Sequence, residues 1–157
     1  MVKNNILSIQ DIHTFINNTF VTVTPIETRR LGGQFAKFLH RGDIVFLYGE
    51  CGSGKTTFVQ GIVRAFGNRI FAKSASFIIV NEYNAFENTK LFHLDLYRLD
   101  KIDIYELGLE EYIYSNNISL IEWPDRLLGM KSNNSWNILL KQDYDVNKRI
   151  IKIDKIK

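Results

Sequence analysis

The sequence has a single cysteine and lacks any long hydrophobic run. Because Cys51 has no partner cysteine, an internal disulfide is excluded, which fits a protein of the reducing cytosol. No apolar run approaches the roughly 18 residues that a membrane-spanning helix requires, so we expect no membrane segment and no membrane partner. Residues 1–7 also lack the long apolar core of a signal peptide. These absences together predict a cytoplasmic protein.

The chain also lacks a run of basic residues. Its formal net charge is +3, and no stretch of about five to eight lysines and arginines is present. This charge permits contact with nucleic acid but does not indicate it. Internal repeats, low-complexity tracts and long linkers are missing as well, so we predict a single domain over residues 1–157.

What the chain does contain is a glycine-rich loop. Residues 49–56, with the sequence G-E-C-G-S-G-K-T, match the pattern G-x-x-x-x-G-K-[ST] at every position. The apolar segment 43–48 before it predicts a buried strand, and residues 57–66 after it carry apolar side chains at helical spacing. A strand, a glycine loop and a helix in this order are the setting of a phosphate-binding loop (P-loop).

The loop has the residue types that nucleotide binding needs. Glycines at 49, 52 and 54 permit backbone angles and close approaches that a Cβ would forbid, so that successive N–H groups can converge on phosphate oxygens. Lys55 would reach the β- and γ-phosphates, and the Thr56 hydroxyl would bind Mg²⁺. Cys51 would supply only its backbone N–H. The residues expected to bind ATP are Glu50, Cys51, Gly52, Ser53, Gly54, Lys55, Thr56 and Thr57.

The rest of the chain predicts an α/β protein. We expect a P-loop NTPase three-layer fold, with a mixed sheet that has a parallel core and antiparallel hairpin strands, and helices on both faces. Expected helices or helical turns are residues 8–17, 24–39, 103–107, 109–113 and a short one from 125. Expected strands, besides the one before the loop, are 20–24, a hairpin of 77–86 and 90–98, 118–122, 136–141 and 149–154.

Two apolar strands carry a carboxylate that could serve as the acid of a nucleotide site. Glu122 ends the strand 118–122, where Trp123-Pro124 stops it, and acids at such strand ends face the ligand side of an open α/β sheet. Asp95 lies within a hairpin strand and could instead pair with Arg98. His93, on the same strand face as Asp95, is expected to be structural. For Trp123, a core position and a flap over the metal are equally open.

Several segments together resemble one protein family. They occur in the order and spacing of the TsaE (YjeE) family, the small bacterial ATPases of the tRNA threonylcarbamoyladenosine pathway. The combination of H-x-D-L-Y-R-L with I-E-W-P is specific, because a generic P-loop kinase is not expected to carry both. The matching segments are residues 28–32, 49–57, 74–77, 81–83, 93–99 and 121–124.

The resemblance implies a Mg²⁺-dependent ATPase that is weak alone and is stimulated by partners. Lys55 and Thr56 keep the roles derived above, Glu122 becomes the acidic residue of the metal site, and Asp95 acts near the metal. Ser76 stands where the family usually has threonine in a switch-like loop that senses the γ-phosphate. Ala75 replaces the usual proline, which is expected to loosen that loop.

The family also implies partners. Its members act on a complex of TsaB and TsaD, and TsaD transfers a threonylcarbamoyl group to adenosine 37 of tRNA. Contact with tRNA is therefore expected only through that complex.

Two other functions stay open on the residues alone. One is a small-molecule or nucleoside kinase, although no arginine-rich lid is visible and the basic residues close behind the strand 118–122 are Arg126 and Lys131. The other is a nucleotide-gated binding module in which hydrolysis is incidental. No segment identifies an adenine pocket.

Overall fold

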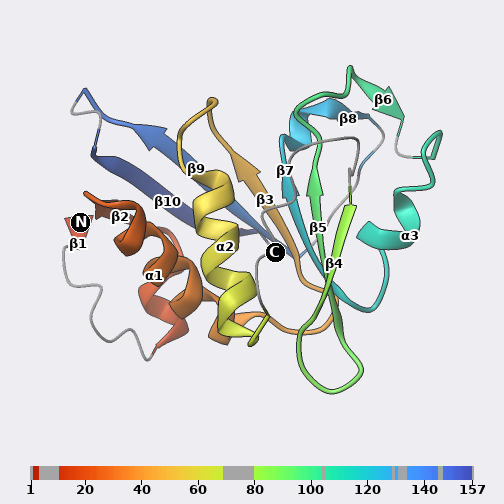
Figure 1. The fold of residues 1–157 in the computed structure, drawn as a ribbon, viewed down its shortest axis with the longest axis horizontal. Coiled ribbons are helices and arrows are strands. Elements are labelled where there is room, and N and C mark those ends of the chain that lie inside the picture. Colours follow the sequence, from red (N-terminus) through yellow and green to blue (C-terminus); the bar gives the residue numbers. More distant parts are fainter. Residues whose placement is uncertain are drawn as a thin grey trace.

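The fold is organised around one mixed sheet (Figure 1). The computed structural model describes residues 2–3, 11–68, 80–103, 105–128, 130, 134–144 and 147–156. Within these ranges the sheet has eight strands, in the order β1-β2-β10-β9-β3-β7-β5-β4. In that order they are Val2–Lys3, Asn18–Thr22, Arg149–Ile156, Ser135–Gln142, Ile44–Tyr48, Ile118–Glu122, Lys90–Asp95 and Val80–Asn84.

The centre of the sheet is parallel and its flanks are mostly antiparallel. Strands β9, β3, β7 and β5 run in one direction, whereas β10 is antiparallel to both β9 and β2, and β4 is antiparallel to β5. The predicted mixed sheet with a parallel core and an antiparallel hairpin is therefore confirmed. Because parallel strands end at the same edge, the carboxyl ends of β3, β7 and β5 lie together, and that edge carries the candidate site.

Helices cover both faces of the sheet, as predicted. Helices α1 (Pro25–Phe35) and α2 (Lys55–Ala65) lie side by side across one face (Figure 1), and the short α3 (Glu110–Ile113) packs on the other. Side-chain alternation along β3 separates two cores: Val45 and Leu47 belong to the core under α1 and α2, and Ile44 and Phe46 belong to the core beside α3.

Two glycines allow α1 and α2 to approach closely. A Cβ added to Gly32 would collide with the carbonyl oxygen of Phe58, and a Cβ added to Gly61 would collide with the carbonyl oxygen of Arg29. A Cβ on Gly33 would meet its nearest neighbour, the carbonyl oxygen of Gly61, at 3.4 Å. The two helices therefore pack backbone against backbone at Gly32 and Gly61.

We expect Gly32→Ala to lower the free energy of unfolding by about 1–3 kcal/mol, because the extra methyl group overpacks the α1–α2 contact. The matched control is Gly33→Ala in the same helix, which should be neutral or stabilising by up to about 1 kcal/mol because alanine is the better helix former. Urea denaturation of both variants measures the difference. Equal losses in the two variants would contradict the close packing.

Helix α1 begins where the sequence predicted a helix, and Thr24 is its N-terminal cap. The Thr24 side chain accepts a hydrogen bond from the Glu27 N–H at 3.1 Å, and Glu27 Oε2 accepts one from the Val23 N–H at 2.8 Å. The predicted helix 24–39 continues beyond α1 as a 3₁₀ turn, η2 (Ala36–Phe38).

The helix predicted over residues 8–17 was wrong in its described part. Residues 8–10 lie outside the described residues. The next residues form one 3₁₀ turn, η1 (Ile12–Thr14), capped by Asp11, whose side chain accepts a hydrogen bond from the His13 N–H. Asn17 then adopts a positive φ of 55°. The chain turns there directly into β2, so no longer helix can form.

The helical predictions near residues 103 and 125 are met only in part, because a short helix is present near residue 125 but both predicted segments also contain residues of a short strand. Strand β6 (Ile102–Asp103) pairs in parallel with β8 (Leu127–Leu128), and the expected short helix is a 3₁₀ turn, η3 (Pro124–Arg126). Each short strand supplies hydrogen-bonding groups to a segment that is distant in sequence. Local patterns do not show such a pairing.

The described residues contain no helix that is both long and apolar enough to cross a membrane.

Candidate functional site

The glycine loop joins β3 to α2 at the carboxyl edge of the parallel strands. Gly49, Gly52 and Gly54 all have positive φ angles, of 139°, 77° and 102°. A Cβ at Gly49 would also collide with the carbonyl oxygen of Leu140, so both conformation and space require glycine there. Gly54 is the N-cap of α2, which places the positive end of the helix against the loop. This geometry suits an anion.

Lys55 is the first residue of α2, and its side chain folds back over the loop. Its Nζ donates hydrogen bonds to the carbonyl oxygens of Gly49 at 2.7 Å and Glu50 at 2.9 Å. The same Nζ lies 4.0 Å from the ring centroid of Trp123. Burial lowers the pKa of Lys55 from its ordinary value, and the nearby Glu122 carboxylate opposes that shift. The ammonium group is therefore held close to where a phosphate would lie.

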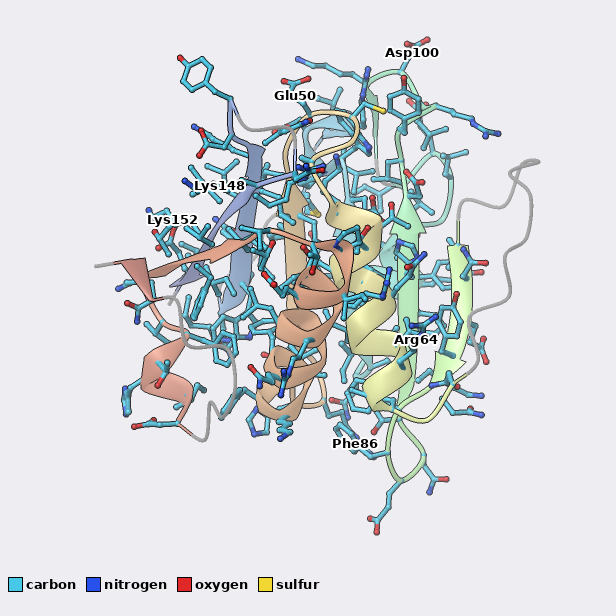
Figure 2. All side chains as sticks on the ribbon, turned by 60° about the vertical axis from the view of Figure 1, so that its left-hand side comes forward. Glu50, Arg64, Phe86, Asp100, Lys148 and Lys152 are labelled. Carbon is cyan, nitrogen blue, oxygen red and sulfur yellow. The ribbon has the colours of Figure 1, made fainter. Side chains whose placement is uncertain are left out.

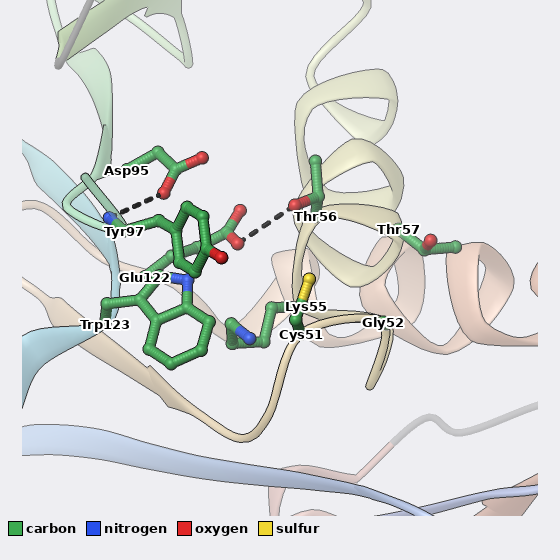
Figure 3. A pocket seen from close by; sticks show the side chains of 10 residues that line it. Cys51, Gly52, Lys55, Thr56, Thr57, Asp95, Tyr97, Glu122 and Trp123 are labelled. Carbon is green, nitrogen blue, oxygen red and sulfur yellow. Dashed lines mark hydrogen bonds between the residues drawn. The ribbon is translucent and has the colours of Figure 1, made fainter.

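Glu122 ends β7 on the face that α2 covers. Its side chain is 2% exposed, and its Oε2 accepts a hydrogen bond from the Thr56 hydroxyl at 2.9 Å, as Figure 3 shows. Its Oε1 lies 2.8 Å from Nε2 of His93 on β5. A buried carboxylate is thus held between the helix that begins at the glycine loop and the neighbouring strand.

Asp95 is brought to the same place by the pairing of β5 with β7. The parallel register sets Asp95 beside Glu122. Its side chain is exposed, and its Oδ1 accepts a hydrogen bond from the Tyr97 N–H at 3.2 Å. This bond turns the chain at the end of β5 and keeps the carboxylate at the pocket.

A pocket of about 250 Å³ lies between the loop and these strand ends. One side of it is formed by the rings of Tyr97 and Trp123, whose centroids are 5.1 Å apart (Figure 3). Trp123 adopts a left-handed backbone, with φ 61° and ψ 49°, which an aromatic residue rarely adopts. Its half-buried ring packs on the α3-side core, one of the two positions left open for it, and also lines the pocket.

Most of the predicted site residues line this pocket. They are Cys51, Gly52, Gly54, Lys55, Thr56, Thr57, Asp95 and Glu122. Two predicted residues do not line it. Ser53 is buried, and among the described residues its hydroxyl has no hydrogen-bond partner. The Glu50 side chain lies at the surface (Figure 2), and the Glu50 carbonyl oxygen accepts a hydrogen bond from Lys55. Ser76 lies outside the described residues.

Two residues at the site were not predicted to act there. His93 was expected to be structural, but it contacts Glu122, and Tyr97 forms part of the pocket wall. The sequence held one signal for His93: it precedes Asp95 by two residues and therefore shares its strand face.

The oxygen atoms at this site fit Mg²⁺. Hydroxyl and carboxylate oxygens are the ligands that this hard cation takes, and it is commonly held by one or two protein groups together with substrate phosphates. The Thr56 hydroxyl and the Glu122 carboxylate supply such a pair. Among the described residues no group of three or more histidine, cysteine, aspartate or glutamate side chains forms a separate metal cluster.

Known proteins share this sequence and fold. The sequence model described as "Threonylcarbamoyl adenosine biosynthesis protein TsaE" matches residues 22–151. The chain is 33% identical over 129 residues to the tRNA threonylcarbamoyladenosine biosynthesis protein TsaE of Bacillus subtilis (strain 168), covering 82% of this chain and 80% of that protein. It is 40% identical over 109 residues to the protein of the same description from Synechocystis sp., covering 67% and 69% of the two chains.

A solved structure agrees with these relatives. The crystal structure of Bacillus subtilis YdiB superimposes with a TM-score of 0.71 at 30% sequence identity, covering 89% of this chain and 86% of that one. The P-loop NTPase fold expected from the sequence is therefore shared with a protein of known structure. By sequence and by fold, the chain belongs to the TsaE family, which takes part in tRNA threonylcarbamoyladenosine biosynthesis.

Proposed function

We propose that this protein is an ATPase that binds and hydrolyses ATP with Mg²⁺ in support of tRNA N6-threonylcarbamoyladenosine formation. The observation that carries the proposal is the hydrogen bond between the Thr56 hydroxyl and the buried Glu122 carboxylate, at the end of a P-loop. Oxygen ligands for a divalent cation thus lie directly beside the anion-binding loop. The names of the relatives supply the pathway.

Each part of the site has a role in this proposal. The loop amides and the N-terminus of α2 bind phosphate oxygens. The Lys55 ammonium leaves the two loop carbonyls for a phosphate, because a charge-assisted hydrogen bond to an anion is stronger than a bond to a neutral carbonyl. Thr56 and Glu122 would hold Mg²⁺, which when bound would neutralise charge on the phosphates.

Among the described residues of the isolated chain, the site offers no strong general base. Both oxygens of Glu122 already take part in hydrogen bonds, to Thr56 and His93. Asp95 is exposed at the pocket, where its charge is largely solvated. We therefore propose that turnover is slow alone and that a TsaB–TsaD complex completes the site, with tRNA contacted only through that complex.

The experiment that tests this function is ATP hydrolysis by the purified chain, with and without TsaB and TsaD from the same organism. We expect a low basal rate that rises when both partners are present. Fast turnover that the partners leave unchanged would contradict the proposal. So would phosphorylation of a nucleoside or shikimate-like acceptor in place of phosphate release, because that product identifies a kinase.

Tryptophan fluorescence should report nucleotide binding. The Trp123 ring lies 4.0 Å from the Lys55 ammonium, whereas Trp136 is buried in the core at 1% exposure. When Lys55 turns to a phosphate, the surroundings of Trp123 change, so we expect ATP to alter the emission of the wild-type protein. Trp123→Phe leaves Trp136 as the remaining tryptophan and should abolish the change. A change that persists in that variant would show that Trp136 reports the nucleotide and would contradict the assignment of the signal to Trp123.

A further inference from the structure

His93 makes a buried contact with the candidate metal site. Its ring lies on β5, on the face covered by α2, and the side chain is 9% exposed. The parallel register pairs His93 with Leu120, and Glu122 follows two residues later on the same face of β7. The imidazole therefore reaches across the two strands, and Nε2 lies 2.8 Å from Oε1 of Glu122.

The chemistry of the two groups determines the direction of this hydrogen bond. An ionised carboxylate only accepts hydrogen bonds, so Nε2 of His93 must carry the proton that it donates to Oε1. The other carboxylate oxygen, Oε2, accepts from the Thr56 hydroxyl at 2.9 Å. One donor on each oxygen fixes the rotation of the carboxylate plane. With His93 in place, Oε2 is directed at the Thr56 hydroxyl, on the side where the P-loop lies.

We propose that His93 is a positioning residue that orients the Glu122 carboxylate for Mg²⁺. This inference rests on the proposed function, because it concerns the same metal site. Without the N–H donor, Oε1 would be a buried oxygen with no partner, and the carboxylate would rotate away from Thr56 to find one. Removal of a side chain that hydrogen-bonds to a metal ligand typically lowers metal affinity or activity by about 10- to 100-fold.

The test compares two substitutions of His93 by a binding measurement. His93→Phe keeps a planar ring but removes the donor, and His93→Gln supplies an amide N–H near the position of Nε2. Calorimetric titration of ATP, with Mg²⁺ and with a chelator, separates the gain in ATP affinity that depends on Mg²⁺ from the ATP affinity without the metal. We expect His93→Phe to reduce that gain by about 10-fold and to leave affinity in the chelator unchanged. His93→Gln should recover most of the gain.

A double-mutant cycle with Glu122→Gln distinguishes positioning from a general structural effect. If His93 acts through the carboxylate, His93→Phe should add little to the loss already caused by Glu122→Gln. An equal loss in both backgrounds, or a His93→Gln variant as poor as His93→Phe, would overturn the proposal. Melting temperatures show whether each variant is folded. If His93→Phe does not fold, the comparison is made between His93→Gln and His93→Asn, because the shorter asparagine amide cannot reach Oε1.

Failure of this role and failure of the proposed function give different results. Wild-type protein that binds no ATP would overturn the proposed function, and the role of His93 with it. ATP binding that depends normally on Mg²⁺ in both the wild type and His93→Phe would overturn only the role of His93.

Discussion

Lys55→Ala should lower the kcat/KM for ATP by about 10²–10³-fold, the usual cost of removing one preorganised donor to developing charge. The structure gives the physical reason, because Lys55 is 4% exposed and its ammonium group is held by two loop carbonyls beside the pocket. Among the described residues, no other lysine and no arginine lines that pocket. Steady-state hydrolysis over a range of ATP concentrations measures the loss.

Two further variants control this prediction. Lys37→Ala removes an exposed lysine from η2, outside the pocket, and should leave kcat/KM unchanged. Lys55→Arg keeps the charge, but the planar guanidinium is larger than the ammonium and does not fit between the two carbonyl oxygens that contact Nζ. We therefore expect the kcat/KM of Lys55→Arg to be close to that of Lys55→Ala. Near wild-type turnover in Lys55→Arg would show that charge alone is required.

Glu122→Gln should lower Mg²⁺-dependent turnover by about 10²-fold or more, while ATP affinity in a chelator is retained. The substitution keeps the shape of the side chain but removes the negative charge that would hold a cation. Loss of a group that holds a metal or stabilises developing charge typically lowers activity by an amount of this size. It also leaves one of two donors, the Thr56 hydroxyl or the His93 N–H, facing an amide N–H. Hydrolysis as a function of Mg²⁺ concentration is the measurement.

The matched control is Glu111→Gln, an exposed acid on α3, outside the pocket, which should change neither turnover nor Mg²⁺ dependence. Substitution of Glu122 also distinguishes an ATPase from a nucleotide-gated module. If Glu122→Ala abolished hydrolysis but supported tRNA modification as well as the wild type in a reconstituted reaction, hydrolysis would be incidental and the ATPase function as proposed would be wrong.

The parts of the site that the sequence predicted are local ones. The loop from Gly49 to Thr56 is defined by consecutive residues, and its glycines have the positive φ angles that the pattern requires. Glu122 and Asp95 were recognised because each is a carboxylate on a predicted apolar strand. Their arrangement next to each other follows from the parallel pairing of β5 and β7, which the strand pattern did not predict.

The parts that the sequence missed depend on contacts between distant segments. His93 and Glu122 are separated by 29 residues, and their hydrogen bond exists because β5 and β7 are neighbours in the sheet. The same reason explains the pairing of β6 with β8 where helical turns were expected. Periodicity reports which face of an element is buried, but it does not identify the element that covers that face.

The P-loop, the helix after it, the antiparallel hairpin and the family can all be recognised in the sequence alone. These features depend on neighbouring residues, whose backbone angles, caps and spacing are readable along the chain. How the Glu122 carboxylate is held depends instead on the packed fold, because its two partners come from α2 and β5. A buried carboxylate needs a donor on each oxygen, and packing of the sheet against α2 determines which side chains can supply them.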